Sequence, residues 1–225
     1  MAREARKLSE SGFYHVVFRG INHQDIFEEE QDFEYMLEIF KVLKQEIGFE
    51  VHAYCLMTNH VQILLKENQP GDISTIIKRL LIKYVMKFNR NYQRSGALIG
   101  SRYKSKAVEV DEYFIPLIIY IHQNPMRAGI VQKLENYKYS SYCEYIAKRE
   151  IVETSLSLDM LGKKEWFKAH QQMVENKFEV EGRKKLSGEE IRQKILKITN
   201  IVPQKIGMLE RRERDKIINQ LKEES

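Results

Sequence analysis

Two pairs of polar residues in this 225-residue chain have spacings that would let their side chains act together in a chemical reaction. His60 and Gln62 lie two apart in an apolar, strand-like stretch, and Tyr120 precedes Asn124 by four in a helix-like one. Side chains two apart share one face of a strand, whereas side chains four apart share one face of a helix. Together the pairs would supply two or three metal ligands and one hydroxyl nucleophile, the parts that cut a phosphodiester through a covalent link to tyrosine.

Each pair has a metal-binding interpretation and a structural one. A histidine nitrogen and an amide oxygen can bind Mg²⁺ or Mn²⁺, so His60 and Gln62 form a candidate cation site. Asn124 could complete the set of ligands, and Gln123 competes with it for that role. On the structural interpretation, a lone histidine beside an apolar strand is more often a hydrogen-bonding residue. Tyr120 stands among isoleucines and would then be a core tyrosine.

Apolar spacing predicts the elements that would position these residues. The expected strands cover 11–20, 49–57, 60–66 and 106–110, and the expected helices cover 33–47, 72–88 and 112–124, the last closed by Pro125. The order β-α-β-β-α-β with an extra helix predicts an α+β, ferredoxin-like split βαβ fold, with two helices on one face of an antiparallel sheet. The polar side of strand 60–66 would then face the helix that carries Tyr120.

Composition indicates a soluble protein with one domain of moderate size and an appendage. Apolar residues make up 43% and charged residues 31% of the chain. No apolar run approaches the roughly 20 residues that cross a bilayer, so no membrane is expected as a partner. The N-terminal segment is charged and lacks the apolar core of a secretion signal. Cys55 and Cys143 have no CxxC spacing, which favours the reducing cytoplasm over a disulfide or zinc framework.

Positive charge and aromatic rings alternate along one part of the chain. From Lys78 to Lys106 there are nine Lys or Arg residues and no Asp or Glu, whereas Glu28 to Glu50 holds eight acids and two lysines. Basic groups neutralise phosphates and aromatic rings stack on unpaired bases, so this run predicts a nucleic-acid partner; the alternative is two solvated helices of opposite sign. Tyr84 and Phe88 continue an apolar stripe and suit the core. The DNA-contact candidates are Tyr92, Arg94, Arg102, Lys104, Arg19, Asn22 and Arg127.

Four motifs occur in an order that resembles a known family. They are YHVVFRGINHQDIF at 14–27, AYCLMTNHVQILLK at 53–66, SRYKS at 101–105 and YIHQNPMRAGIV at 120–131. Residues 12–145 resemble the single-tyrosine HUH transposases (IS200-like transposase domain), particularly the REP-associated tyrosine transposases. The resemblance implies a bacterial, nucleoid-associated enzyme that cuts and rejoins single-stranded or hairpin DNA through a 5′-phosphotyrosine. It also implies that Tyr120 is the nucleophile and that His60 and Asn124 hold Mg²⁺ or Mn²⁺.

Gln62 departs from the family pattern, which has a second histidine at that position. Related nucleases with glutamine there are known, but a neutral amide oxygen is a weaker ligand than imidazole. This keeps a second function open, namely a domesticated hairpin-binding protein or regulator with little or no cleavage activity. A third, an RNA-binding ferredoxin-like module, is disfavoured because no strand carries the aromatic-rich motif of such domains.

The resemblance also bears on domain organisation. It allows a homodimer as well as a protein that acts alone. The catalytic domain is expected over 1–145, followed by a helical extension over 146–225 that ends before a helix-turn-helix. Within that extension, 187–199 and 203–222 suit helices.

Overall fold

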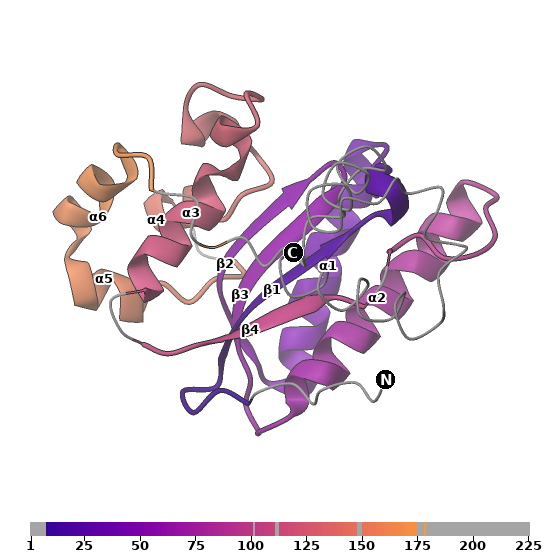
Figure 1. The fold of residues 1–225 in the computed structure, drawn as a ribbon, viewed down its shortest axis with the longest axis horizontal. Helices are drawn as coiled ribbons and strands as arrows, with labels where there is room; N and C mark the ends of the chain where they lie inside the picture. Colours follow the sequence, from indigo (N-terminus) through magenta and orange to yellow (C-terminus); the bar gives the residue numbers. More distant parts are fainter. Residues whose placement is uncertain (1–7, 101, 111–112, 148–149, 175–177, 179–225) are drawn as a thin grey trace, which may run out of the picture. The chain divides into compact units, whose positions relative to one another are not determined.

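A four-stranded antiparallel sheet forms the centre of the fold (Figure 1). The structure is a computed structural model and describes residues 8–100, 102–110, 113–147, 150–174 and 178. The strands lie in the order β2-β3-β1-β4, and every neighbouring pair is antiparallel. Their bounds are β1 Phe13–Arg19, β2 Glu50–Met57, β3 His60–Lys66 and β4 Lys104–Val108. With two intervening helices, this order confirms the predicted ferredoxin-like arrangement.

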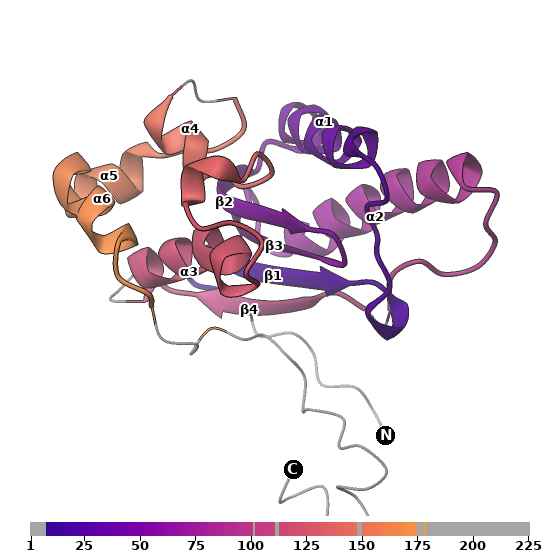
Figure 2. The same cartoon turned by 90° about the horizontal axis from the view of Figure 1, so that it is seen from above.

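Helices α1 (Glu30–Ile47) and α2 (Asp72–Asn91) cover one face of the sheet (Figure 2). Tyr54 of β2 lies opposite Ile63 of β3, and its ring contacts Phe40 of α1 at 5.9 Å between centroids. The apolar side of β3 therefore meets these helices, as the alternation predicts. Gly48 ends α1 with a left-handed φ of 85°, a conformation that costs glycine little.

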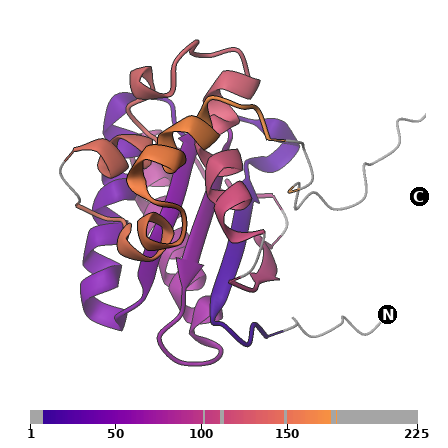
Figure 3. The same cartoon turned by 90° about the vertical axis from the view of Figure 1, so that its left-hand side faces the viewer.

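Helix α3 (Phe114–Arg127) covers the opposite face, where Phe114 contacts Phe13 of β1 edge-on at 5.0 Å between ring centroids. A helix that is apolar nearly all round must be buried on several sides. Helix α3 meets this condition because the sheet lies on one side of it and later helices pack on another (Figure 3). Tyr120 is thereby brought over the polar side of β3.

The prediction that Pro125 closes this helix is wrong, since α3 continues to Arg127. Proline lacks an N–H and would leave the carbonyl oxygen one turn earlier without a donor. The side chain of Asn124 supplies that donor, because its Nδ2 lies 3.2 Å from the carbonyl oxygen of Ile121. Gly129, with a φ of 69°, follows the helix end. The fourth strand also differs, since pairing with β1 begins at Lys104 rather than Lys106.

Three short helices follow α3, starting just before the predicted end of the catalytic domain at residue 145. They are α4 (Tyr142–Ile146), α5 (Ser155–Leu161) and α6 (Lys163–His170). Trp166 of α6 is fully buried and stacks on Tyr145 at 4.4 Å, and Val152 forms a bridge to Val51 of β2. One compact unit runs from Met1 to Val180, and the expected boundary of the catalytic domain after 145 stays a prediction. The helices expected over 187–199 and 203–222 lie outside the described residues.

Two further features concern the cysteines and the possibility of a membrane-spanning helix. Cys55 and Cys143 are both free thiols. Within the described part of the chain, no helix has the length and apolarity to span a bilayer.

Two buried histidines join α3 to α6. His122 Nδ1 lies 3.0 Å from His170 Nε2, and His170 Nδ1 donates to the carbonyl oxygen of Trp166 at 2.8 Å. Because that proton sits on His170 Nδ1, His122 must donate to His170 Nε2, and both rings are neutral. Burial lowers the pKa of His122 well below its usual value and lowers that of His170 to about 4.

The free energy of unfolding should therefore fall as the pH drops below 6.5, the ordinary pKa of histidine. There the unfolded chain takes up protons that the folded chain does not bind, at a cost of up to about 1.4 kcal/mol per pH unit and histidine. We expect urea unfolding to give a lower free energy at pH 5.5 than at pH 7.0, with a shallower dependence in a His170→Asn variant. An equally steep dependence in that variant would show that His170 does not contribute to it.

Candidate functional site

One face of the sheet, here called the site face, carries most of the polar candidates. Pairing places Arg19 of β1 opposite His60 of β3, and Lys106 of β4 opposite His15 of β1. Residues directly opposite one another point to the same face, as do residues two apart on one strand. On β1, β3 and β4 the polar residues of the site face are His15, Arg19, His60, Gln62, Lys66, Lys104 and Lys106.

A chain of hydrogen bonds connects the site face to the helix that carries Tyr120. His15 Nε2 lies 3.0 Å from Gln62 Oε1, and Gln62 Nε2 donates to Asn124 Oδ1 at 2.8 Å. Asn124 Nδ2 donates to the carbonyl oxygens of Tyr120 and Ile121. His15 and Gln62 are buried, and 9% of Asn124 is exposed. Strands β1 and β3 and helix α3 therefore meet at Gln62.

The acceptors in this chain fix the direction of each bond. Two carbonyl oxygens face the Asn124 amide, so its nitrogen lies on their side and its oxygen faces Gln62. Gln62 then turns its oxygen to His15, which has to donate through a proton on Nε2. Burial lowers the pKa of His15 to about 4. The hydrogen bond to Gln62 acts in the opposite direction, and the positive charge of Lys106 adds a smaller lowering. His15 is therefore a neutral donor near pH 7.

Tyr120 lies beneath side chains from several segments, and only 4% of the residue is exposed. Its ring is nearly perpendicular to that of His15, with 6.5 Å between centroids, and 5.5 Å from that of Phe178. The guanidinium carbon of Arg127 lies 5.1 Å from the Tyr120 ring centroid. A cation and an imidazole thus adjoin the candidate nucleophile.

The structure separates the two candidates for the third ligand. Gln123 faces the segment after α6, where its Nε2 donates to the carbonyl oxygen of Gln172 at 2.7 Å and its Oε1 accepts from the amide of Val174 at 3.0 Å. Asn124 is instead hydrogen-bonded to Gln62. The geometry favours Asn124 over Gln123 as a partner of the residues on β3.

The hydrogen bond of His60 selects the tautomer that a metal-binding histidine would have. Its Nδ1 lies 2.7 Å from Asn59 Oδ1, an amide oxygen that can only accept, so Nδ1 carries the proton. The lone pair then resides on Nε2. Histidines that bind metals usually donate their other ring N–H to such an oxygen, which fixes the tautomer and the orientation of the ring.

The amides of Gln62 and Asn124 fit a shared cation after one rotation. The 2.8 Å between Gln62 Nε2 and Asn124 Oδ1 is close to the separation of about 3 Å between neighbouring ligands of Mg²⁺. A half-turn of the Gln62 amide would bring both oxygens together. His15 Nε2 would then accept from Gln62, which a neutral imidazole does by moving its proton to Nδ1. The donor set of His60, Gln62 and Asn124 contains no carboxylate, so it is neutral.

The sequence does not single out His15 or Lys106, which the structure places in the site. Lys106 follows Lys104 by two, so alternation along the strand would have placed both on one face. No local signal pairs His15 with Gln62, because the register of β1 against β3 is a tertiary property.

Three DNA-contact candidates gather at the end of the sheet where β3 begins. The turn after β1 packs against the β2–β3 hairpin through main-chain hydrogen bonds. Arg19 lies opposite His60. Asn22 is exposed in the turn, and Arg94 reaches the same turn by donating to Gln24 Oε1 at 3.0 Å. Of these three candidates, Arg19 lies directly beside a candidate ligand of the cation, His60.

The remaining DNA-contact candidates lie either near the site face or among helices α1 and α2 on the opposite face of the sheet. Lys104 lies on the site face, Arg102 is exposed just before it, and Arg127 adjoins Tyr120. Tyr92 differs, because its hydroxyl donates to Asp32 of α1 at 2.7 Å. It thereby joins the two helices on the opposite face of the sheet.

The aromatic residues of α2 lie in the core, as predicted. Tyr84 and Phe88 are each only 1% exposed. Phe88 also contacts the ring of Tyr92 at 4.6 Å between centroids.

Comparison with known sequences bears directly on this site. Residues 9–124 match the family described as "Transposase IS200 like", and the match spans more than half of the chain. The chain belongs to the IS200-like transposase family. The matched stretch of this IS200-like chain runs from just before β1 to Asn124 and contains His60, Gln62 and Tyr120.

The IS200-like chain is also similar to individual proteins. A Haemophilus influenzae Rd protein named as a REP-associated tyrosine transposase is 25% identical over 113 residues. The similarity covers 46% of this chain and 64% of that relative, so the chain spans less than two thirds of the relative's length. A solved REP-associated tyrosine transposase bound to a REP hairpin has a TM-score of 0.55 at 15% identity, covering 66% of this chain and 87% of that one. This likeness confirms the fold.

Proposed function

We propose that this IS200-like protein cuts and rejoins single strands of DNA, with Tyr120 as the nucleophile. The observation that carries the proposal is the hydrogen bond between Gln62 of β3 and Asn124, which lies one turn after Tyr120 on α3. Membership of a transposase family supports the same reaction class. The similarity to a protein solved with a REP hairpin supports hairpin DNA as the substrate.

The reaction exchanges one phosphodiester for another. The Tyr120 oxygen attacks the scissile phosphorus and loses its proton, while the bond from phosphorus to the 3′-oxygen breaks and that oxygen takes up a proton. The products are a 5′-phosphotyrosine and a free 3′-hydroxyl. A 3′-hydroxyl from a second strand can attack the phosphotyrosine, which restores Tyr120 and rejoins the DNA. Arg127, 5.1 Å from the Tyr120 ring, would hold the negatively charged phosphate.

His60, Gln62 and Asn124 would hold Mg²⁺ or Mn²⁺, and such an ion would polarise the scissile phosphate. Support comes from the protonation of His60 on Nδ1 and from the spacing of the two amides. Because the donor set is neutral and the Gln62 amide must rotate by a half-turn to present its oxygen, we expect the affinity for the ion to be modest. His15 would support Gln62 in either orientation of its amide.

Two observations favour the alternative, a hairpin-binding regulator with little cleavage activity. Gln62 and Asn124 are bonded to each other, and only 4% of Tyr120 is exposed. A labelled single-stranded hairpin incubated with Mn²⁺ separates the two functions. The transposase leaves a shortened strand and a protein–DNA adduct on a denaturing gel. The regulator shifts the hairpin in a native gel and leaves the strand intact.

A Gln62→His variant should bind Mn²⁺ about tenfold more tightly, because imidazole is the better donor for this ion. Titration calorimetry with Mn²⁺ measures the dissociation constant directly. Gln62→Met, which keeps the length of the side chain and removes the amide, is the matched control and should weaken binding. If both variants bind like the parent protein, position 62 does not contact the ion.

A further inference from the structure

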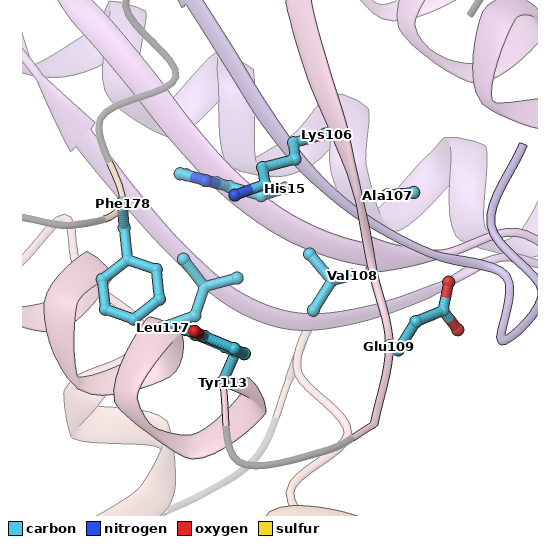
Figure 4. A pocket seen from close by; sticks show the side chains of 8 residues that line it. All are labelled: His15, Lys106, Ala107, Val108, Glu109, Tyr113, Leu117 and Phe178. Carbon is cyan, nitrogen blue, oxygen red and sulfur yellow. The ribbon is translucent and has the colours of Figure 1, made fainter. Parts of the chain in front are cut away.

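A cavity of about 330 Å³ lies between strand β4 and the first half of α3 (Figure 4). Pockets for small ligands begin at roughly 300 Å³, so the cavity can hold a group of the size of a nucleobase. Its walls include His15 and Lys106 from the site face, Val108 at the end of β4, Tyr113 and Leu117 of the α3 region, and Phe178. The DNA-contact candidates predicted from the sequence do not include these residues.

The cavity shares walls with the proposed site of cleavage. The ring of His15 lies 6.5 Å from that of Tyr120, and the ring of Phe178 lies 5.5 Å from it. Leu117 precedes Tyr120 by three residues, almost one turn of α3. A nucleotide whose phosphate lies at Tyr120 would therefore have its base beside the opening of this cavity.

The lining suits a flat aromatic group attached to a phosphate. Val108 and Leu117 supply an apolar floor, and the rings of Tyr113 and Phe178 approach edge to face at 6.3 Å. Lys106 is exposed and makes no ion pair within the described part of the chain. Aromatic faces with a nearby cation are the combination that binds unpaired bases and their phosphates.

The one acidic residue of the lining is already engaged. Glu109 Oε1 accepts from the amide of Glu10 at 3.3 Å, and its Oε2 accepts from the amide of Ser11 at 3.1 Å. These bonds hold the carboxylate toward the segment before β1. Glu109 keeps its charge in these bonds, and Lys106 is the cation of the lining that can meet a phosphate.

We infer that this cavity binds the unpaired base next to the phosphate that Tyr120 attacks. The exposed ring of Tyr113 stacks on the base, the nearly perpendicular ring of Phe178 meets its edge, and Lys106 contacts the phosphate on its far side. The inference rests on the proposed function and adds to it a binding site for the strand that is cut. It assigns positioning of the DNA to the edge strand β4 as well as to the loop before it.

Photo-crosslinking tests this assignment without requiring cleavage. The probe is a 20-nucleotide oligo-dT with one 5-iododeoxyuridine, and mass spectrometry of the digested protein locates the crosslink. We expect it on Tyr113 or Phe178. Tyr113 is 53% exposed, so Tyr113→Ala should fold normally, and it should weaken oligo-dT binding roughly five-fold, the low end for one stacked base.

Charge variants provide the matched comparison. Lys106→Gln should weaken binding several-fold, whereas Lys78→Gln, an equal loss of charge on α2 across the sheet, should leave it nearly unchanged. Equal losses from the two variants would overturn the role of Lys106. Crosslinks confined to Tyr92 or Tyr103 would overturn the cavity assignment and leave the proposed function standing. Failure to bind either oligo-dT or a hairpin would instead contradict the proposed function.

Discussion

Tyr120→Phe should abolish the covalent protein–DNA adduct, lowering its rate of formation by at least about a thousand-fold. The substitution removes only the hydroxyl. The phenyl ring keeps its contacts with His15 and Phe178 and its place beneath Arg127, so we expect normal folding and DNA binding. A labelled hairpin on a denaturing gel reports the adduct, and fluorescence anisotropy reports binding.

Tyr35→Phe is the matched control, because Tyr35 lies on α1, on the opposite face of the sheet from Tyr120. This variant should form the adduct at the parental rate. An adduct that persists in Tyr120→Phe and disappears in Tyr113→Phe would transfer the nucleophilic role to Tyr113.

Replacing Arg94, Arg102 and Lys104 together by glutamine should weaken binding to single-stranded DNA roughly 100-fold at 0.1 M salt. Each phosphate contact contributes about 0.7 to the slope of log K against log salt, so three lost contacts should flatten the slope by about 2. The structural basis is their location, since Lys104 lies on the site face, Arg102 precedes it, and Arg94 reaches the turn after β1. Anisotropy titrations at several salt concentrations measure both quantities.

The control for that variant removes an equal charge from α6, through glutamine at Lys163, Lys164 and Lys168. Lys168 already pairs with Glu165 of the same helix at 2.8 Å, and the three lysines lie outside the stretch that matches the transposase family. We expect this control to bind nearly as tightly as the parent chain. If both variants lost the same affinity, the basic run would be ordinary solvated surface.

Local sequence signals were sufficient to predict the fold. Alternating apolar residues located the strands, and Gly48 marked the end of α1, because these signals depend on a few neighbouring residues. The same reliance on local signals led to the wrong prediction that Pro125 ends α3. Its local effect is to break a helix, but the side chain of Asn124 satisfies the carbonyl oxygen of Ile121.

Longer-range packing decided what the sequence could not predict about the site. The spacings of His60 with Gln62 and of Tyr120 with Asn124 placed each pair on one face, and the structure brings Gln62 and Asn124 into contact. The bond from His15 to Gln62 depends on the register between two strands, which no single segment encodes. Tyr92 was predicted from the sequence as a DNA contact. Its hydroxyl instead donates to Asp32 on α1, a partner that is distant in the sequence.

The most direct test of the account is to identify the amino acid that becomes attached to DNA. The protein would be incubated with a single-stranded hairpin and Mn²⁺, denatured, digested with protease and nuclease, and analysed by tandem mass spectrometry. We predict a nucleotide linked through its 5′-phosphate to Tyr120, within the peptide that also contains Asn124. A nucleotide attached to Tyr103 or Tyr113, or a bound hairpin that never becomes attached to the protein, would contradict the central claim that Tyr120 cuts DNA.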